Sequence, residues 1–182
     1  TVKIDVVLMD ESTSMEEPGF DKGNSKRRTM DKALRQHVKT RSEMYPDDLI
    51  AIVGYDEEAQ LCCPLLNVRD DYKRILAGLK AANEMSGGGT CMKNGLRIAR
   101  DLLLKSRSRL LVPGVNVITR VLAYSDGADG SRSESCRFAK ELKTNGVLIE
   151  TFGIGLDRTD VDEAFLKQIA TKTGEFIHYR FL

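Results

Sequence analysis

Four stretches of the chain are short, almost continuously apolar and rich in β-branched residues. They cover residues 4–9, 49–55, 115–124 and 147–154. Short apolar runs without polar alternation are typical of strands that are buried on both faces, as in a parallel sheet. Residues 59–63 form a shorter candidate that ends before Pro64, and we interpret it as an edge strand. Residues 176–179 are the expected final strand.

Between these runs, apolar residues recur at helical spacing. The predicted helices cover residues 29–44, 72–79, 92–103, 133–145 and 161–173. Thr29 is the expected N-cap of the first helix, and the polar residues 16–28 before it are expected to form a loop. Gly146 and Gly174 are expected to end the last two helices, because glycine readily adopts the left-handed conformation found there.

The alternation of strands and helices predicts an α/β fold of the Rossmann-like, doubly wound type. We expect a mostly parallel central sheet with one short antiparallel edge strand and helices on both faces. The chain has no internal repeat or low-complexity tract, and 182 residues suit one domain. We therefore expect residues 1–182 to form a single domain. Because a predicted strand follows Thr1 almost directly, we also expect this domain to have been excised from a longer protein.

Composition narrows the class of protein but does not identify a function. The chain is 41% hydrophobic and 30% charged, which is ordinary for a globular domain. Its 28 basic and 27 acidic residues give a net charge of +1, so charge gives no reason to expect binding to nucleic acid or to a membrane. No apolar run approaches the roughly 20 residues that a membrane-spanning helix needs.

The four cysteines do not have the spacing of a zinc site or of a redox motif. They are Cys62, Cys63, Cys91 and Cys136. Free, buried or half-buried thiols are the favoured interpretation, and they indicate a reducing compartment. The expected location is the cytoplasm, or the extracellular space if an upstream signal peptide has been removed.

Polar residues follow two of the predicted strands and precede one predicted helix. Asp10, Ser12 and Ser14 come after the first strand, Asp126 follows a central strand, and Thr90 comes after a glycine-rich turn. In an open parallel sheet, the loops beyond the carboxyl ends of the strands converge on one crevice. These five side chains are therefore the candidate binding site.

These five positions resemble the metal-ion-dependent adhesion site of von Willebrand factor A domains, in the order and on the elements that the family uses. The resemblance covers essentially the whole chain. It implies that Ser12 and Ser14 bind the metal directly, that Thr90 binds it directly or through water depending on state, and that Asp10 and Asp126 hold its water shell. Hydroxyl and carboxylate oxygens are hard ligands and suit Mg²⁺ or Mn²⁺ rather than zinc or copper.

The resemblance also implies a function, namely that the metal ion binds a glutamate or aspartate carboxylate of a protein partner. Intracellular relatives of this kind often serve as adaptors. In some relatives metal ligation is coupled to movement of the last helix, which here would be residues 161–173.

Two positions depart from the common pattern. Thr13 stands where glycine is frequent, which requires an ordinary backbone conformation there, and Ser125 stands where threonine is frequent.

The leading alternative is a Mg²⁺-dependent phosphatase of the haloacid-dehalogenase type that uses Asp10 as its nucleophile. That mechanism needs a second carboxylate two residues later, and this chain has Ser12 there. The chain also has no phosphate-binding loop motif and no nucleophile elbow. We therefore expect a binding module with no catalytic residues and not an enzyme.

Several nearby residues have plainer interpretations. Ser12 and Ser14, taken alone, are more often turn caps than metal ligands. We expect Glu11 to face solvent. The basic residues between the first strand and the first helix are expected to form a solvated loop, with a secondary role as rim contacts for an acidic partner. They are Lys22, Lys26, Arg27 and Arg28.

Overall fold

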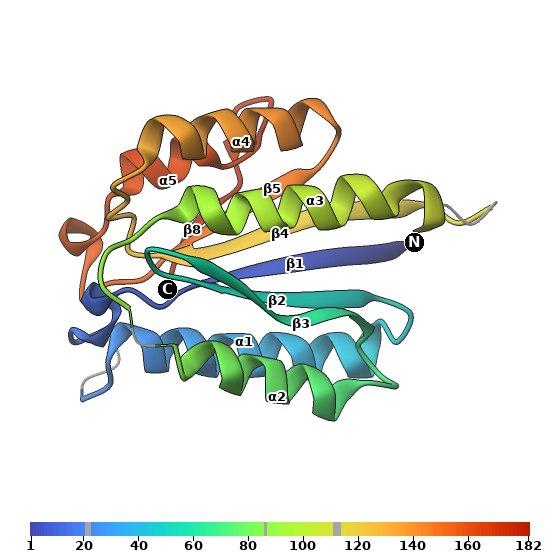
Figure 1. Ribbon diagram of the computed structural model, residues 1–182, viewed down its shortest axis with the longest axis horizontal. Coiled ribbons are helices and arrows are strands. Elements are labelled where there is room, and N and C mark those ends of the chain that lie inside the picture. The colour runs from blue at the N-terminus through green and yellow to red at the C-terminus, as the bar shows by residue number, and fades with distance from the viewer. Residues whose placement is uncertain (21–22, 86, 111–113) are drawn as a thin grey trace.

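A six-stranded sheet forms the centre of the computed structural model, which describes residues 1–20, 23–85, 87–110 and 114–182. The strand order across the sheet is β3-β2-β1-β4-β5-β8 (Figure 1). The strands are β1 (Val2–Asp10), β2 (Leu49–Tyr55), β3 (Ala59–Asn67), β4 (Val117–Ser125), β5 (Leu148–Gly153) and β8 (Tyr179–Phe181). All neighbours are parallel except β2 and β3, so the predicted fold class is confirmed.

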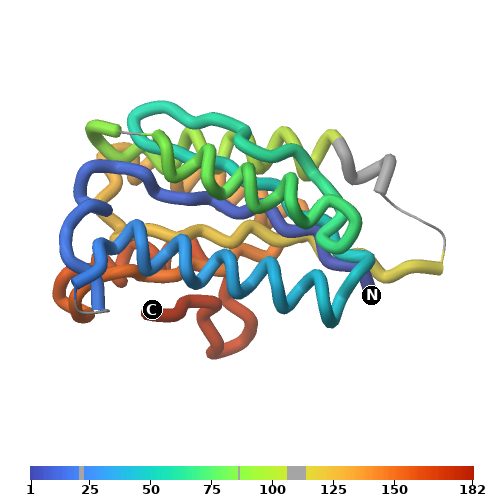
Figure 2. The backbone as a smooth tube through the Cα atoms, turned by 90° about the horizontal axis from the view of Figure 1, so that it is seen from below, coloured from blue at the N-terminus to red at the C-terminus, as the bar shows by residue number. Residues whose placement is uncertain are grey.

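Helices cover both faces of this sheet. On one face lie α1 (Lys26–Met44) and α2 (Tyr72–Asn83), which stand in front of the sheet in Figure 2. On the other face lie α3 (Met92–Leu110), α4 (Arg132–Thr144) and α5 (Glu163–Ile169). Within the described residues, no helix is both long and apolar enough to cross a membrane.

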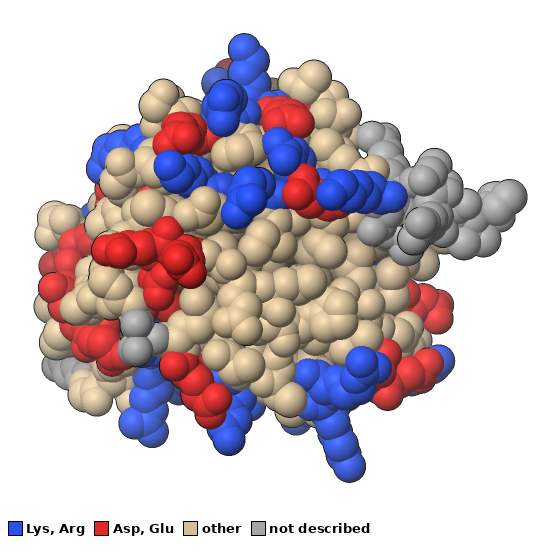
Figure 3. Space-filling view, viewed as in Figure 1, with Lys and Arg blue, Asp and Glu red and all other residues tan. Residues whose placement is uncertain are grey.

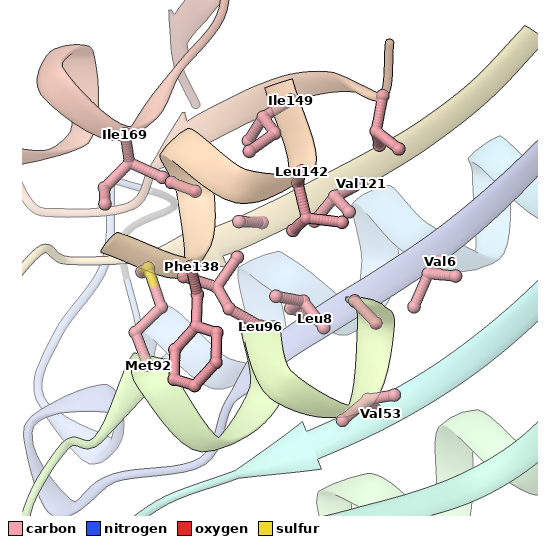
Figure 4. Packing of buried hydrophobic residues seen from close by; sticks show 14 of the residues in the cluster. Val6, Leu8, Val53, Met92, Leu96, Val121, Phe138, Leu142, Ile149 and Ile169 are labelled. Atoms are coloured by element: carbon pink, nitrogen blue, oxygen red, sulfur yellow. The ribbon is translucent and has the colours of Figure 1, made fainter. Parts of the chain in front are cut away.

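Two apolar cores hold the layers together, one on each face of the sheet. Successive residues of β1 alternate between them, because strand side chains point to opposite faces. Val6 and Leu8 join the core under α3, α4 and α5, which Figure 4 shows from close by. Val7 and Met9 join the core under α1 and α2. Burial on both faces explains why the β1 sequence is apolar almost without interruption.

The start of α1 differs from the prediction. The helix begins at Lys26, three residues before the predicted start at Thr29, and its N-cap is Ser25, whose Oγ accepts a hydrogen bond from the Arg28 backbone N at 3.3 Å. Residues 13–16, part of which was expected to be loop, form the short 3-10 helix η1 (Thr13–Glu16). The α1 prediction was therefore too short at its beginning.

The edge strand is longer than predicted. β3 runs through Pro64 to Asn67 and does not end at Cys63. Proline lacks the N–H that a central strand would need, but an edge strand has one side that requires no partner. The pairing of β3 with β2 shifts register on either side of Cys63, which accommodates the proline.

The chain after α5 also differs from the prediction. α5 ends at Ile169 and does not reach Thr173, because Thr171 leaves the helix to pair with β5: its backbone N donates to Ile149 O at 2.9 Å. Thr171 Oγ1 accepts a bond from Ile149 N at 2.8 Å. Gly174, with φ of 61°, lies in a turn between the short strands β6 (Lys172–Thr173) and β7 (Phe176–Ile177). The final strand of the main sheet, β8, begins at Tyr179, the last residue of the predicted strand 176–179.

Candidate metal centre at the carboxyl edge of the sheet

Asp10 is the last residue of the central strand β1 and is fully buried. Its Oδ1 accepts a hydrogen bond from the Ser12 backbone N at 3.0 Å, and its Oδ2 accepts one from Ser125 Oγ at 2.6 Å. Burial raises the pKa of Asp10 to about 6, against the opposing effect of the Ser12 and Ser125 hydrogen bonds, and the nearby Asp126 carboxylate raises it further. The carboxylate is held rigidly by the ends of two adjacent strands.

Ser12 and Ser14 present their hydroxyls side by side, with their Oγ atoms 3.2 Å apart. Ser12 is buried and has an extended backbone, and the chain then enters η1. Met15, fully buried in the core under α1, anchors this turn. The loop therefore has a fixed shape that keeps the two hydroxyls on one side.

Thr13, between the two serines, joins this loop to the glycine-rich turn. Its Oγ1 donates to Gly87 O at 2.6 Å, and its backbone N donates to Gly88 O at 3.2 Å. No non-glycine residue in the described part of the chain has a positive φ, so the expectation of an ordinary backbone at Thr13 is confirmed. Threonine here makes a contact that glycine would lack.

Thr90 follows the glycine-rich turn and is 8% exposed. Its carbonyl accepts a hydrogen bond from Gly130 N at 3.0 Å, which fixes it to the loop after β4. The turn itself packs closely on the β2–β3 connection, since a Cβ on Gly87 would lie 2.2 Å from the Asp56 Cβ. Only glycine fits this approach, and the glycines therefore position Thr90 through close backbone packing.

Asp126 follows β4 and is 4% exposed. Its Oδ1 accepts from Ala128 N at 3.1 Å, and its carbonyl accepts from Asp162 N at 2.9 Å. The next residue, Gly127, has φ of 85°, a conformation that side chains other than glycine rarely adopt. Asp126 is thus tied to its own turn and to the loop that leads into α5.

The structure brings four of the five predicted side chains into one connected group. Asp10, Ser12 and Ser14 are linked by hydrogen bonds, and the charges of Asp10 and Asp126 interact. Ser14 and Asp126 line the same cavity, of about 440 Å³. Thr90 is attached to this corner through the backbone contacts of its own loop.

The donor set fits a hard divalent cation. It consists of carboxylate and hydroxyl oxygens, which Mg²⁺ and Mn²⁺ prefer. Among the described residues, no group of three or more histidine, cysteine, aspartate or glutamate side chains is arranged to hold a metal. The five predicted ligands include only two side chains of these types, Asp10 and Asp126, and the other three are serine and threonine residues.

Glu11 does not face solvent, and that expectation was wrong. Its side chain is fully buried, with Oε2 2.7 Å from Arg27 Nε. Arg27 also donates to the Glu11 carbonyl at 2.9 Å. Burial raises the pKa of Glu11 to about 8 although the charge of Arg27 opposes this. Glu11 is buried because α1, which begins at Lys26, lies over this loop and places Arg27 against it.

Lys26 was also expected in a solvated loop, and it is instead 1% exposed. Its Nζ lies 3.0 Å from Asp160, 3.1 Å from Glu17 and 3.3 Å from Asp126. Burial alone would lower the pKa of Lys26, but these carboxylates raise it overall, so the ammonium is charged. Of the other basic residues, Arg28 is exposed, and Lys22 lies outside the described residues.

Asp129 is a buried supporting residue that the sequence analysis did not identify. Its carboxylate accepts hydrogen bonds from Met92 N (3.2 Å), Ser131 N (3.0 Å), Ser131 Oγ (2.7 Å) and Ser135 Oγ (2.6 Å). It thereby joins the start of α3, two residues after Thr90, to the start of α4. The spacing of Asp129 and Ser131 repeats that of Asp10 and Ser12, and this was the available signal.

The chain belongs to the von Willebrand factor type A domain family, whose model matches residues 6–128. The matched stretch contains all five predicted ligands. Domains of this family commonly mediate protein–protein interaction. No curated protein matches the sequence.

Solved structures with the same fold share little sequence with this chain. The hypothetical protein BatB from Bacteroides thetaiotaomicron has a TM-score of 0.70 and 18% identity, with 100% of this chain and 90% of that chain covered. The manganese-loaded TRAP protein of Plasmodium vivax has a TM-score of 0.69 and 17% identity, covering 98% and 67%. A von Willebrand factor type A protein from Catenulispora acidiphila has a TM-score of 0.70 and 21% identity, covering 92% and 36%.

Proposed function

We propose that this domain binds one Mg²⁺ or Mn²⁺ ion at the carboxyl edge of the sheet and, through that ion, a glutamate or aspartate of a protein partner. The proposed ligands are Asp10, Ser12, Ser14, Thr90 and Asp126. The proposal is carried by one observation: the hydroxyls of Ser12 and Ser14 lie side by side next to a buried carboxylate that is already fixed by two hydrogen bonds.

Each of these residues has a distinct part in the proposal. Ser12 and Ser14 contribute neutral oxygens, so a bound ion keeps much of its positive charge. Asp10 and Asp126 hold the surrounding water shell and orient it, and Thr90 completes the set from the glycine-rich turn. The bound ion supplies the charge that attracts a partner's carboxylate.

The charge of the surrounding surface supports a role for the metal in recognising an acidic partner. Acidic side chains gather at the end of the molecule where these loops lie, on the left of Figure 3. Exposed glutamates on these loops are Glu16, the last residue of η1, Glu17 directly after it, and Glu57 and Glu58 in the β2–β3 connection. A partner carboxylate approaching this edge alone would be repelled, since like charges brought together at an interface are unfavourable. Binding of an acidic partner is therefore expected to require the ion.

The family and the fold support this assignment. The family commonly mediates protein–protein interaction, and a protein of similar fold, the TRAP protein of Plasmodium vivax, was crystallised loaded with manganese. The phosphatase alternative gains no support from the family match, and Ser12 stands where its second carboxylate is needed. We therefore propose a binding module, an adaptor within a protein assembly, that catalyses no reaction.

Calorimetric titration of the metal-stripped domain with MgCl₂ and MnCl₂ tests the proposal. We expect one binding site, lost in Asp10→Ala and in the double variant Ser12→Ala/Ser14→Ala. Ser42→Ala, at the far end of α1, is the matched control and should bind as the wild type does. Acetate, used as the simplest carboxylate probe, should bind the metal-loaded domain and not the metal-stripped one. Metal binding that survives the double serine variant would overturn the proposed ligand set.

A further inference from the structure

Lys26 stands out among the basic residues because its charge is buried beside the proposed metal ligands. Lysine is rarely fully buried unless it is paired, and here three carboxylates surround the ammonium. They come from three separate segments: Glu17 follows η1, Asp126 follows β4, and Asp160 belongs to the 3-10 helix η2 (Arg158–Asp160). All four residues line the 440 Å³ cavity that Ser14 also lines.

One of these carboxylates has two possible cationic partners. Asp126 Oδ2 lies 3.3 Å from Lys26 Nζ, and Asp126 is also a proposed metal ligand. An ammonium and a divalent ion that share one carboxylate are only a few ångströms apart, and in partly buried surroundings like charges at that separation repel strongly. The chain thus places a positive charge of its own close to the position proposed for the metal ion.

We propose that Lys26 is an internal competitor of the metal ion: its ammonium neutralises Asp126 in the metal-free domain and weakens the binding of the divalent ion. This inference rests on the proposed function. Lys26 acts as a positioning residue, since it touches Asp126 and not the partner. Glu17 and Asp160 are the acceptors that keep the ammonium when the ion engages Asp126.

The competition has a consequence for partner binding. A site whose metal affinity is lowered by a resident cation fills more completely when a partner's carboxylate adds its negative charge. By linkage, each ligand then raises the affinity for the other by the same factor. The domain would therefore hold metal and acidic partner together and hold each more weakly alone.

The test is Mg²⁺ titration of Lys26→Met, which removes the charge and keeps a side chain of similar length. We expect this variant to bind Mg²⁺ about tenfold tighter than the wild type, or more, because a positive charge beside the ion is gone. Lys39→Met is the matched control. It removes the same charge from an exposed position on the same helix, about 20 Å away at 1.5 Å per residue, and it should bind as the wild type does. A purely structural role for Lys26 would lower stability without tightening metal binding.

A second pair of variants keeps the proposal testable if Lys26→Met does not fold. Glu16 and Glu17 are adjacent and similarly exposed, 57% and 60%, but only Glu17 contacts Lys26. Glu17→Gln should weaken Mg²⁺ binding severalfold, because Lys26 loses an acceptor and holds Asp126 more firmly. Glu16→Gln should have a smaller effect.

The outcomes separate this inference from the proposed function. A single wild-type site that is lost in Ser12→Ala/Ser14→Ala supports the proposed function whatever Lys26 does. With that site in place, wild-type or weaker affinity in Lys26→Met overturns the competition, as do equal losses in the two glutamate variants. Absence of Mg²⁺ binding in both the wild type and Lys26→Met overturns both proposals.

Discussion

Replacing Asp129 by alanine is expected to destabilise the domain strongly, although Asp129 is not one of the proposed metal ligands. The carboxylate is 6% exposed and accepts four hydrogen bonds, from Met92, from Ser131 twice and from Ser135. At about 1 kcal/mol net for each bond, the expected loss is about 4 kcal/mol of the free energy of unfolding. For a chain of this length, that corresponds to a fall in Tm of about 10 °C.

Urea denaturation followed by circular dichroism measures this loss. Asp157→Ala is the matched control, because Asp157 also accepts bonds from a nearby backbone N and hydroxyl, both of Thr159, but lies on the surface. Its removal should cost less than about 1 kcal/mol. A loss below about 1 kcal/mol for Asp129→Ala would refute the view that this carboxylate holds the starts of α3 and α4 together.

Three further predictions concern the core and the turns. Asp5→Asn should cost about 3 kcal/mol, since it breaks a buried pair with Arg120 (Nη2–Oδ2 2.6 Å). Burial would raise the pKa of Asp5, but hydrogen bonds from its partners lower this pKa overall. The stability of the wild type should therefore fall as the pH drops below about 4 and through the lowered pKa of the folded state. Urea midpoints that fall equally with pH in the wild type and in Asp5→Asn would contradict this. Gly127→Ala should destabilise more than Gly174→Ala in thermal melts, because both have positive φ but only the first Cβ would meet neighbouring atoms, at 2.9 Å. Cys63 should be the slowest of the four free thiols to react with iodoacetamide in the native state, because burial raises its pKa to about 11; labelling of Cys63 as fast as in urea would refute this.

The sequence pattern predicted the sheet well because burial on both faces leaves a simple signal. The prediction for β2, residues 49–55, matches the strand in the structure, and the ends of β4 and β5 differ from the predictions by one or two residues. Helix ends were harder to predict. Ser25 and Thr29 are both good caps by residue type, and the early start of α1 shows which one is used. The early end of α5 depends on Thr171 pairing with β5, a contact that is distant in sequence.

The sequence could predict which residues of the candidate site lie close together where the order of the strands decides it. The ends of parallel strands meet at one edge, so Asp10 and Asp126 had to lie near each other once β1 and β4 were neighbours. The burial of Glu11 and Lys26 was not predictable, because both are charged residues in polar stretches. Only the placement of α1 over the loop after β1 shows that they are buried beside their partners.

The most direct test of metal binding is anomalous diffraction from crystals of the domain soaked in MnCl₂. We expect one strong manganese peak, at bonding distance from the Oγ atoms of Ser12 and Ser14 and close to Asp10, Thr90 and Asp126. A peak elsewhere on the molecule, or none at a manganese concentration that saturates the calorimetric titration, would contradict it.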